Sequence, residues 1–89
     1  MIRKSVIYSG HVQGVGFRFT VQRASGGFDV TGFVKNLPDG RVELVAEGVR
    51  DEVGRFLDEV AHRLRGNIHH VLQSENPTEG HFSKFEIRY

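Results

Sequence analysis

The sequence predicts an α+β fold: a two-layer sandwich with the element order βαββαβ, a mostly antiparallel sheet, and two helices on one face of that sheet. Three observations predict it. Apolar residues alternate along several short segments, as in half-buried strands, and recur at helical spacing in two others. Between two of the strand-like segments, Leu37-Pro38-Asp39-Gly40 is typical of a hairpin turn, because proline presets the first turn angle and glycine accepts a left-handed conformation.

The first half of the chain contains two expected strands and a short helix. The first strand is expected over residues 2–12, and its apolar face carries Val6, Tyr8 and Val12. Apolar residues at positions 17, 21 and 24 then predict a helix that Gly26-Gly27 ends. The second strand is expected over residues 28–36, and its apolar face carries Phe28, Val30, Val34 and, at its end, Asn36.

The second half returns from the hairpin and adds a longer helix. The strand over residues 41–47 alternates, with Val42, Leu44 and Ala46 expected to face inward and Glu43 and Glu47 outward. The helix is expected over residues 49–64, with one apolar stripe of Val49, Val53, Phe56, Leu57, Val60 and Leu64. A fourth strand over 68–74, a loop over 75–80 and a last strand over 82–89 complete a ferredoxin-like sandwich with one extra strand. The inward face of the fourth strand is left open. Residues 1–89 are expected to form a single domain.

Composition narrows the classes of function. The net charge is only +1, so no overall basic field indicates binding to nucleic acid. The absence of cysteine excludes disulfides, thiolate nucleophiles and cysteine-bound zinc. No apolar segment has the length of a signal peptide or a membrane span, so a cytoplasmic protein without a membrane partner is expected, and we expect it to be a monomer.

The segment from Gly10 to Arg18 (GHVQGVGFR) lies between the first strand and the first helix. Its glycines permit backbone conformations that bring amides close to a ligand, and a helix N-terminus adds unpaired N–H groups and a partial positive charge. Arg18 adds a planar cation that suits phosphate oxygens. The segment therefore predicts a phosphate-binding loop.

Asn36 ends the second strand and is expected to reach this loop if the first and second strands lie near one another. A carboxamide is no base at neutral pH, but it holds a water molecule by donating and accepting hydrogen bonds. Hydrolysis of an activated phosphoryl compound needs little beyond such positioning and charge stabilisation. No cluster of metal ligands is visible in the sequence, so neither a metal nor a cofactor is expected. His69 and His70, as neighbours on a strand, would point to opposite faces.

Taken together, these segments resemble the acylphosphatase family. The resemblance rests on GHVQGVGFR at 10–18, on GFVKN at 32–36 followed by Asp39-Gly40, Val42 and Gly48, and on the ending FEIRY at 85–89. It implies an enzyme with a ferredoxin-like fold that hydrolyses the carboxyl-phosphate bond of small acyl phosphates, such as acetyl, carbamoyl or glyceroyl phosphate, to a carboxylate and inorganic phosphate without a metal. It also implies that Arg18 is the catalytic, phosphate-binding arginine and that Asn36 orients the attacking water. The substrate phosphate would lie against the backbone amides of Gln13, Gly14, Val15, Gly16, Phe17 and Arg18.

Two other readings of the sequence stay open. A domain of this kind could bind an acyl phosphate or carbamoyl phosphate without useful turnover. Alternatively, ferredoxin-like sheets recognise RNA through exposed strand aromatics on a basic face. Phe33 and Lys35 fit that pattern, whereas Glu43 and Glu47 oppose it. Among the histidines, His11 borders the predicted phosphate loop and could tune anion binding when protonated.

Overall fold

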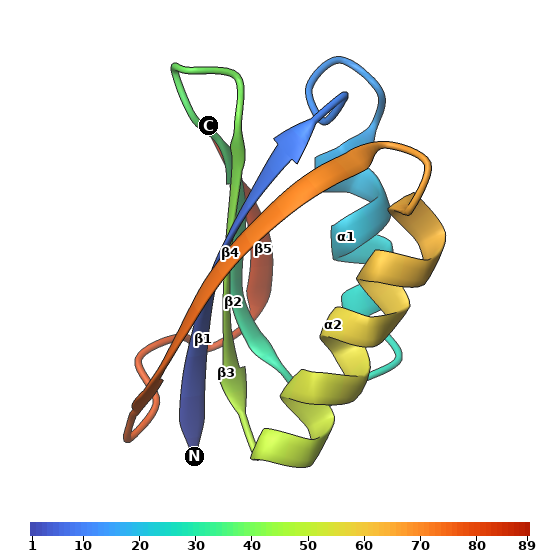
Figure 1. The fold of residues 1–89 in the computed structure, drawn as a ribbon. Coiled ribbons are helices and arrows are strands. Elements are labelled where there is room, and N and C mark those ends of the chain that lie inside the picture. Colours follow the sequence, from blue (N-terminus) through green and yellow to red (C-terminus); the bar gives the residue numbers. More distant parts are fainter.

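A computed structural model describes all residues from 1 to 89 and has two layers, a five-stranded sheet and two helices that cover one face of it (Figure 1). This confirms the predicted ferredoxin-like α+β sandwich and its extra strand. The elements in chain order are β1 (Ile2–Gly10), α1 (Phe17–Ser25), β2 (Thr31–Asn36), β3 (Val42–Gly48), α2 (Arg50–Leu64), β4 (Ile68–Pro77) and β5 (Phe85–Arg88).

The sheet order is β4-β1-β3-β2-β5, and every pairing is antiparallel except the parallel pair β2–β5. The strands β1 and β2 are therefore not neighbours, because β3 lies between them. Both nevertheless end at the same end of the sheet, where Val42 at the start of β3 pairs with Tyr8 on one side and Asn36 on the other. This topology brings the glycine loop after β1 close to the last residue of β2.

The core lies between the sheet and the helices and follows the predicted periodicities. Val34, Leu44 and Phe56 are fully buried there, and α1 buries its predicted apolar stripe. The prediction that Val49 belongs to the apolar stripe of α2 is wrong. Val49 precedes the helix as its N-terminal cap, in an extended conformation, and is 59% exposed. Its side chain cannot share the helical face because its backbone is not helical.

Several other boundaries differ from the prediction. The strand β1 ends at Gly10, two residues before the expected end at 12. The strand β2 begins only at Thr31, because Phe28 still belongs to the turn that ends α1, where its amide bonds the Ser25 carbonyl. The strand β4 continues to Pro77, because it stays paired with β1 until Pro77 lies opposite Ile2. The first part of the expected 75–80 loop is therefore strand. The strand β5 covers only residues 85–88 of the expected 82–89. Apart from half-buried Ile68, every residue of β4 is exposed, so neither face of this strand is buried.

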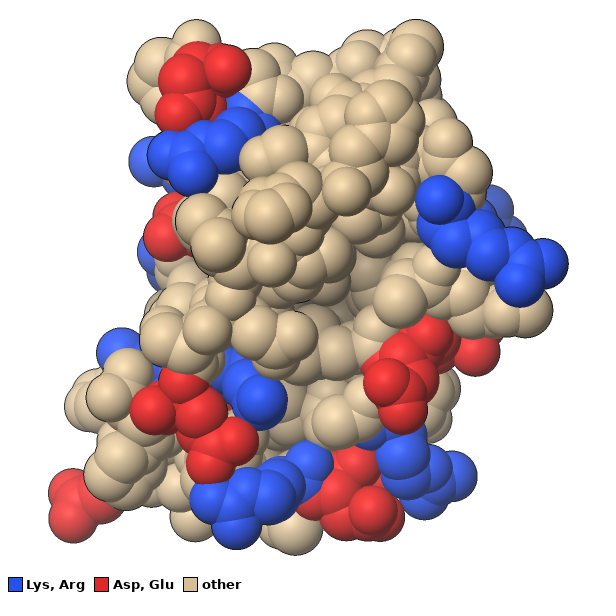
Figure 2. Space-filling model, viewed as in Figure 1, with Lys and Arg blue, Asp and Glu red and all other residues tan.

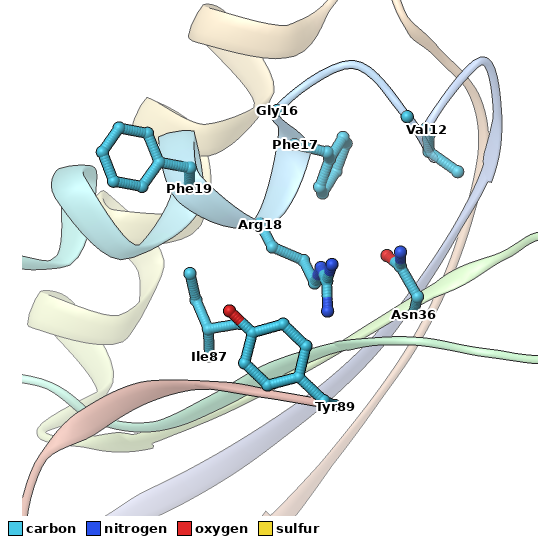
Figure 3. A pocket seen from close by; sticks show the side chains of 9 residues that line it. Val12, Gly16, Phe17, Arg18, Phe19, Asn36, Ile87 and Tyr89 are labelled. Carbon is cyan, nitrogen blue, oxygen red and sulfur yellow. The ribbon is translucent and has the colours of Figure 1, made fainter.

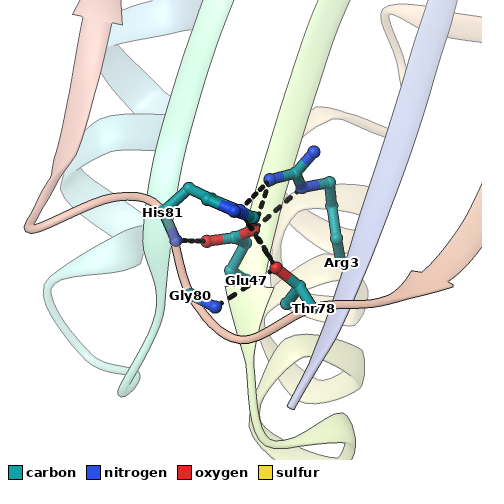
Figure 4. Close-up of polar contacts among 5 residues, drawn as sticks. All are labelled: Arg3, Glu47, Thr78, Gly80 and His81. Atoms are coloured by element: carbon teal, nitrogen blue, oxygen red, sulfur yellow. Dashed lines mark hydrogen bonds and ion pairs between the residues drawn. The ribbon is translucent and has the colours of Figure 1, made fainter.

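Glu47 was predicted to face outward, but it is not exposed to solvent. It does lie on the sheet face opposite the helices, but residues 78–81 fold over it and leave it 1% exposed. Its carboxylate accepts hydrogen bonds from the His81 amide, the Thr78 hydroxyl and the Arg3 guanidinium (Figure 4). Burial alone would raise the pKa of Glu47, but these hydrogen bonds outweigh it and lower the pKa to about 2.

The face of the molecule shown in Figure 2 carries charges of both signs. On the face shown in Figure 2, lysine and arginine side chains alternate with aspartate and glutamate over its lower part, and no continuous basic surface forms there. No helix has the length and apolar character that crossing a membrane requires.

Candidate active site

The loop after β1 presents a row of unpaired backbone amides. Gly14 and Gly16 both have φ of +76°, a left-handed conformation that costs other residues about 1–2 kcal/mol. Gly16 caps α1 in this conformation, with no side chain capping the helix and no acidic residue in its first turn. None of the amides from Gln13 to Phe19 donates a hydrogen bond within the protein. Such a row of donors at a helix N-terminus is suited to an anion.

Arg18 occupies the first turn of α1, beside these amides. One of its terminal nitrogens donates to the Arg88 carbonyl oxygen at 3.2 Å, and its guanidinium carbon lies 4.7 Å from the centre of the Tyr89 ring. No carboxylate lies within ion-pair distance of it. Arg88 of β5 and Tyr89 thus hold the guanidinium in place without neutralising its charge.

Asn36 reaches the same space from the end of β2. It shares a sheet face with buried Val34, two residues earlier, and this face is the one the helices cover. Its Oδ1 atom is buried and has no hydrogen-bond partner in the protein, which is rare and costly for a buried acceptor. In Figure 3 the side chains of Asn36 and Arg18 point toward one another across the pocket.

These groups line one pocket of about 150 Å³. Its lining residues are Val12, Gly14, Gly16, Phe17, Arg18, Phe19, Asn36, Ile87 and Tyr89. The structure thus brings together five of the seven predicted site residues. Gln13 and Val15 do not line the pocket: the Gln13 side chain bonds to the β2–β3 turn, and Val15 is 38% exposed. The expected contacts of their backbone amides with phosphate stay predictions.

Sequence reasoning missed the contribution of β5 to the pocket. Ile87 of β5 and Tyr89, the residue after this strand, line the pocket because β5 runs parallel to β2, with Ile87 opposite Val34. The alternation of Phe85, Ile87 and Tyr89 along the last strand indicated their shared face, but not which site that face would meet.

No histidine, aspartate or glutamate side chain lines the pocket. His11 is exposed, and its backbone amide bonds to the Asn67 carbonyl. The side chains that line the pocket thus include neither a carboxylate nor an imidazole.

The aromatic residue that suggested RNA binding packs against side chains of the same protein. The ring of Phe33 makes an edge contact with Phe82, with centroids 5.8 Å apart, and the Arg88 guanidinium lies 4.2 Å from its centroid. The ring is therefore already in contact with two side chains of the same protein.

Comparison with known proteins points to one family. A sequence model of acylphosphatases matches residues 4–87. An acylphosphatase of Methanospirillum hungatei is 44% identical over 84% of this chain and 87% of its own length, and one of Nocardia farcinica is 38% identical over 98% and 88%. The crystal structure of the Bacillus subtilis acylphosphatase superposes over the full length of both chains with a TM-score of 0.88 and 32% identity.

The match spans nearly the whole chain, and the residues of the pocket lie within the matched range except Tyr89. The same arrangement of sheet and helices is found in a solved member of the family. The chain therefore belongs to the acylphosphatase family of hydrolytic enzymes.

Proposed function

We propose that this pocket hydrolyses the carboxyl-phosphate bond of small acyl phosphates, with the phosphate held by the amides of residues 13–18 and by Arg18. The unpaired amides and the unneutralised guanidinium lie side by side and offer several donors to one dianionic phosphate group. Acetyl, carbamoyl and glyceroyl phosphates all carry the phosphate group that these donors would bind. The domain of residues 1–89 would act as one unit and, in this proposal, as a monomer.

The observation that carries the catalytic part of the proposal is the buried, unpartnered Oδ1 of Asn36. A water molecule in the pocket would donate to this oxygen and direct a lone pair toward the phosphorus atom. Asn36 thus has the role of a positioning group for the nucleophile, opposite Arg18. The carboxamide does not remove the proton.

The chemistry of the substrate supplies what the pocket lacks. Water forms a new P–O bond while the P–O bond to the acyl group breaks, and the carboxylate leaves without protonation because it is a weak base. The proton of the water passes to an oxygen of the transferring phosphoryl group. Arg18 and the loop amides stabilise the charge on the equatorial oxygens during this transfer. The proposed mechanism requires neither a metal nor a cofactor.

The test compares benzoyl phosphate with para-nitrophenyl phosphate in the presence of a chelator. We expect rapid hydrolysis of benzoyl phosphate only, because the phenolate of the second substrate is a poorer leaving group than a carboxylate. The Asn36→Ala variant should lose at least about 100-fold in kcat. Asn76→Ala, the same change at an exposed position of β4, is the matched control and should keep the activity of the wild type.

Three outcomes would count against the proposal. Equal hydrolysis of both substrates would refute the substrate class, and full activity of Asn36→Ala would refute the role of Asn36. Phosphate binding without hydrolysis of any acyl phosphate would favour the non-catalytic binding module instead.

A further inference from the structure

The side chain of Gln13 links the two halves of the pocket. Its Nε2 donates both hydrogens across the gap to the β2–β3 turn, one to the Leu37 carbonyl at 2.8 Å and one to the Arg41 carbonyl at 2.9 Å. The loop that carries Gln13 also carries the phosphate-facing amides, and Leu37 directly follows Asn36 in the chain. One amide group therefore joins the loop to the residue next to Asn36.

This link is the loop's main tie to the hairpin. The backbone hydrogen bonds near the loop run elsewhere: the His11 amide bonds to Asn67, and the Thr20 amide bonds back to Gly16 within α1. Between these two points, the only other side-chain hydrogen bond runs from Arg18 to the Arg88 carbonyl in β5, and it does not reach the hairpin. The left-handed glycines on either side of Val15 leave this part of the backbone few steric restraints of its own.

The chemistry of the contact selects a primary amide. Both acceptors are backbone carbonyls, and an amide group offers two N–H donors in a plane, with no charge to add to the phosphate site. Each carbonyl also accepts a bond inside the turn, Leu37 from the Gly40 amide and Arg41 from the Leu37 amide. Both carbonyls of the hairpin therefore keep a hydrogen bond without Gln13. The two bonds from Gln13 are not needed to close the turn, and they fix the position of the loop relative to the hairpin.

We propose that Gln13 is a positioning residue that sets the distance between the phosphate-binding amides and Asn36; this inference rests on the function proposed above. The attacking water and the phosphorus atom must meet within a few tenths of an ångström, and an error of 1 Å costs about 100-fold in rate. Removing the Gln13 donors loosens one half of the site relative to the other. Phosphate binding, which needs only the loop and Arg18, is retained.

The test uses Gln13→Met, which keeps the length of the side chain and the loop amide but removes the donors. We expect kcat for benzoyl phosphate to fall about tenfold to 100-fold, while the dissociation constant of inorganic phosphate changes less than about threefold. The matched control is Gln22→Met on α1, whose side chain makes no hydrogen bond, and it should behave as wild type. Circular dichroism verifies that the variants fold. Gln13→Asn, one methylene too short to reach both carbonyls, gives a second and milder variant.

A double-variant cycle separates positioning from a merely structural role. In an Asn36→Ala background, Gln13→Met should change kcat by less than about threefold, because the group that it positions is already gone. The inference is overturned if Gln13→Met keeps the kcat of wild type, lowers kcat by the same factor in both backgrounds, or weakens phosphate binding in step with kcat. Full turnover by Asn36→Ala alone would refute the role of Asn36, and this inference with it.

Discussion

Replacing Glu47 with glutamine preserves the shape of a buried side chain and removes its charge. The carboxylate accepts from the His81 amide on one oxygen, at 2.7 Å, and from Thr78 and the Arg3 Nε on the other, both at 2.8 Å. Glutamine has one acceptor oxygen and one NH₂ group. Whichever way its amide is turned, the NH₂ group faces at least one donor, and Arg3 loses its negative partner.

The expected cost follows from these contacts. Each donor that is left without an acceptor in a buried place costs about 1–3 kcal/mol, and breaking a buried ion pair by removing one partner costs about 3–5 kcal/mol. Arg3 is 31% exposed and can regain part of its solvation, which moves the estimate to the lower end of that range. We expect Glu47→Gln to lower the free energy of unfolding by about 3 kcal/mol at pH 7.

Urea unfolding followed by circular dichroism measures this difference. The matched control is Glu43→Gln on the same strand, because the Glu43 side chain makes neither a hydrogen bond nor an ion pair; its effect should stay within about 0.5 kcal/mol. A loss below about 1 kcal/mol for Glu47→Gln would refute the reasoning that this carboxylate anchors residues 78–81 to the sheet.

The contacts of the Glu47 carboxylate also make the stability of the protein depend on pH. The pKa of Glu47 is lowered in the fold from 4.5 to about 2, so its ionisation stabilises the protein above pH 4.5. That stabilisation, at most about 3 kcal/mol, is lost as the pH falls from 4.5 toward 2. The difference in stability between wild type and Glu47→Gln should therefore shrink over this interval. A difference that stays constant between pH 7 and pH 2 would contradict the assignment.

Two further substitutions test the packing. Gly54→Ala, inside α2, should raise the free energy of unfolding by about 0.5–1 kcal/mol, because a Cβ there meets nothing within 4 Å and alanine favours the helix; a lower melting temperature would contradict this. Gly32→Ala should abolish cooperative unfolding, since its Cβ would overlap the Val45 carbonyl oxygen and its φ is +141°. A soluble Gly32→Ala protein with a near-native melting transition would show that β2 and β3 can separate there.

Local periodicity was enough to predict the elements that build the core. The alternation in β1, β2 and β3 and the helical spacing in α1 follow directly from which side chains must be buried. The approach of Asn36 to the glycine loop was also predictable, because Asn36 shares the face of Val34 and the element order restricts the strand topology. The glycine loop, Arg18 and Asn36 therefore meet as the sequence indicated, whereas the contribution of Ile87 and Tyr89 to the pocket was not predicted.

Contacts between distant segments could not be predicted in the same way. The alternation along β3 gives Glu47 the outward face correctly, but only the path of residues 78–81 decides that this face is covered. The extension of β4 to Pro77 depends on pairing with Ile2, and the reach of Gln13 to Leu37 depends on how loop and hairpin pack. None of these has a local sequence signal.

The most direct test of the proposed division of roles is the dissociation constant of inorganic phosphate, measured by calorimetry beside kcat for Arg18→Ala and Asn36→Ala. Arg18→Ala should weaken phosphate binding about tenfold to 100-fold, because charge-assisted hydrogen bonds are lost, whereas Arg65→Ala at the exposed end of α2 should not. Asn36→Ala should bind phosphate within about threefold of wild type and lose at least about 100-fold in kcat. Weakened phosphate binding in Asn36→Ala with unchanged kcat, or unchanged binding in Arg18→Ala, would contradict the assignment of binding to Arg18 and of water positioning to Asn36.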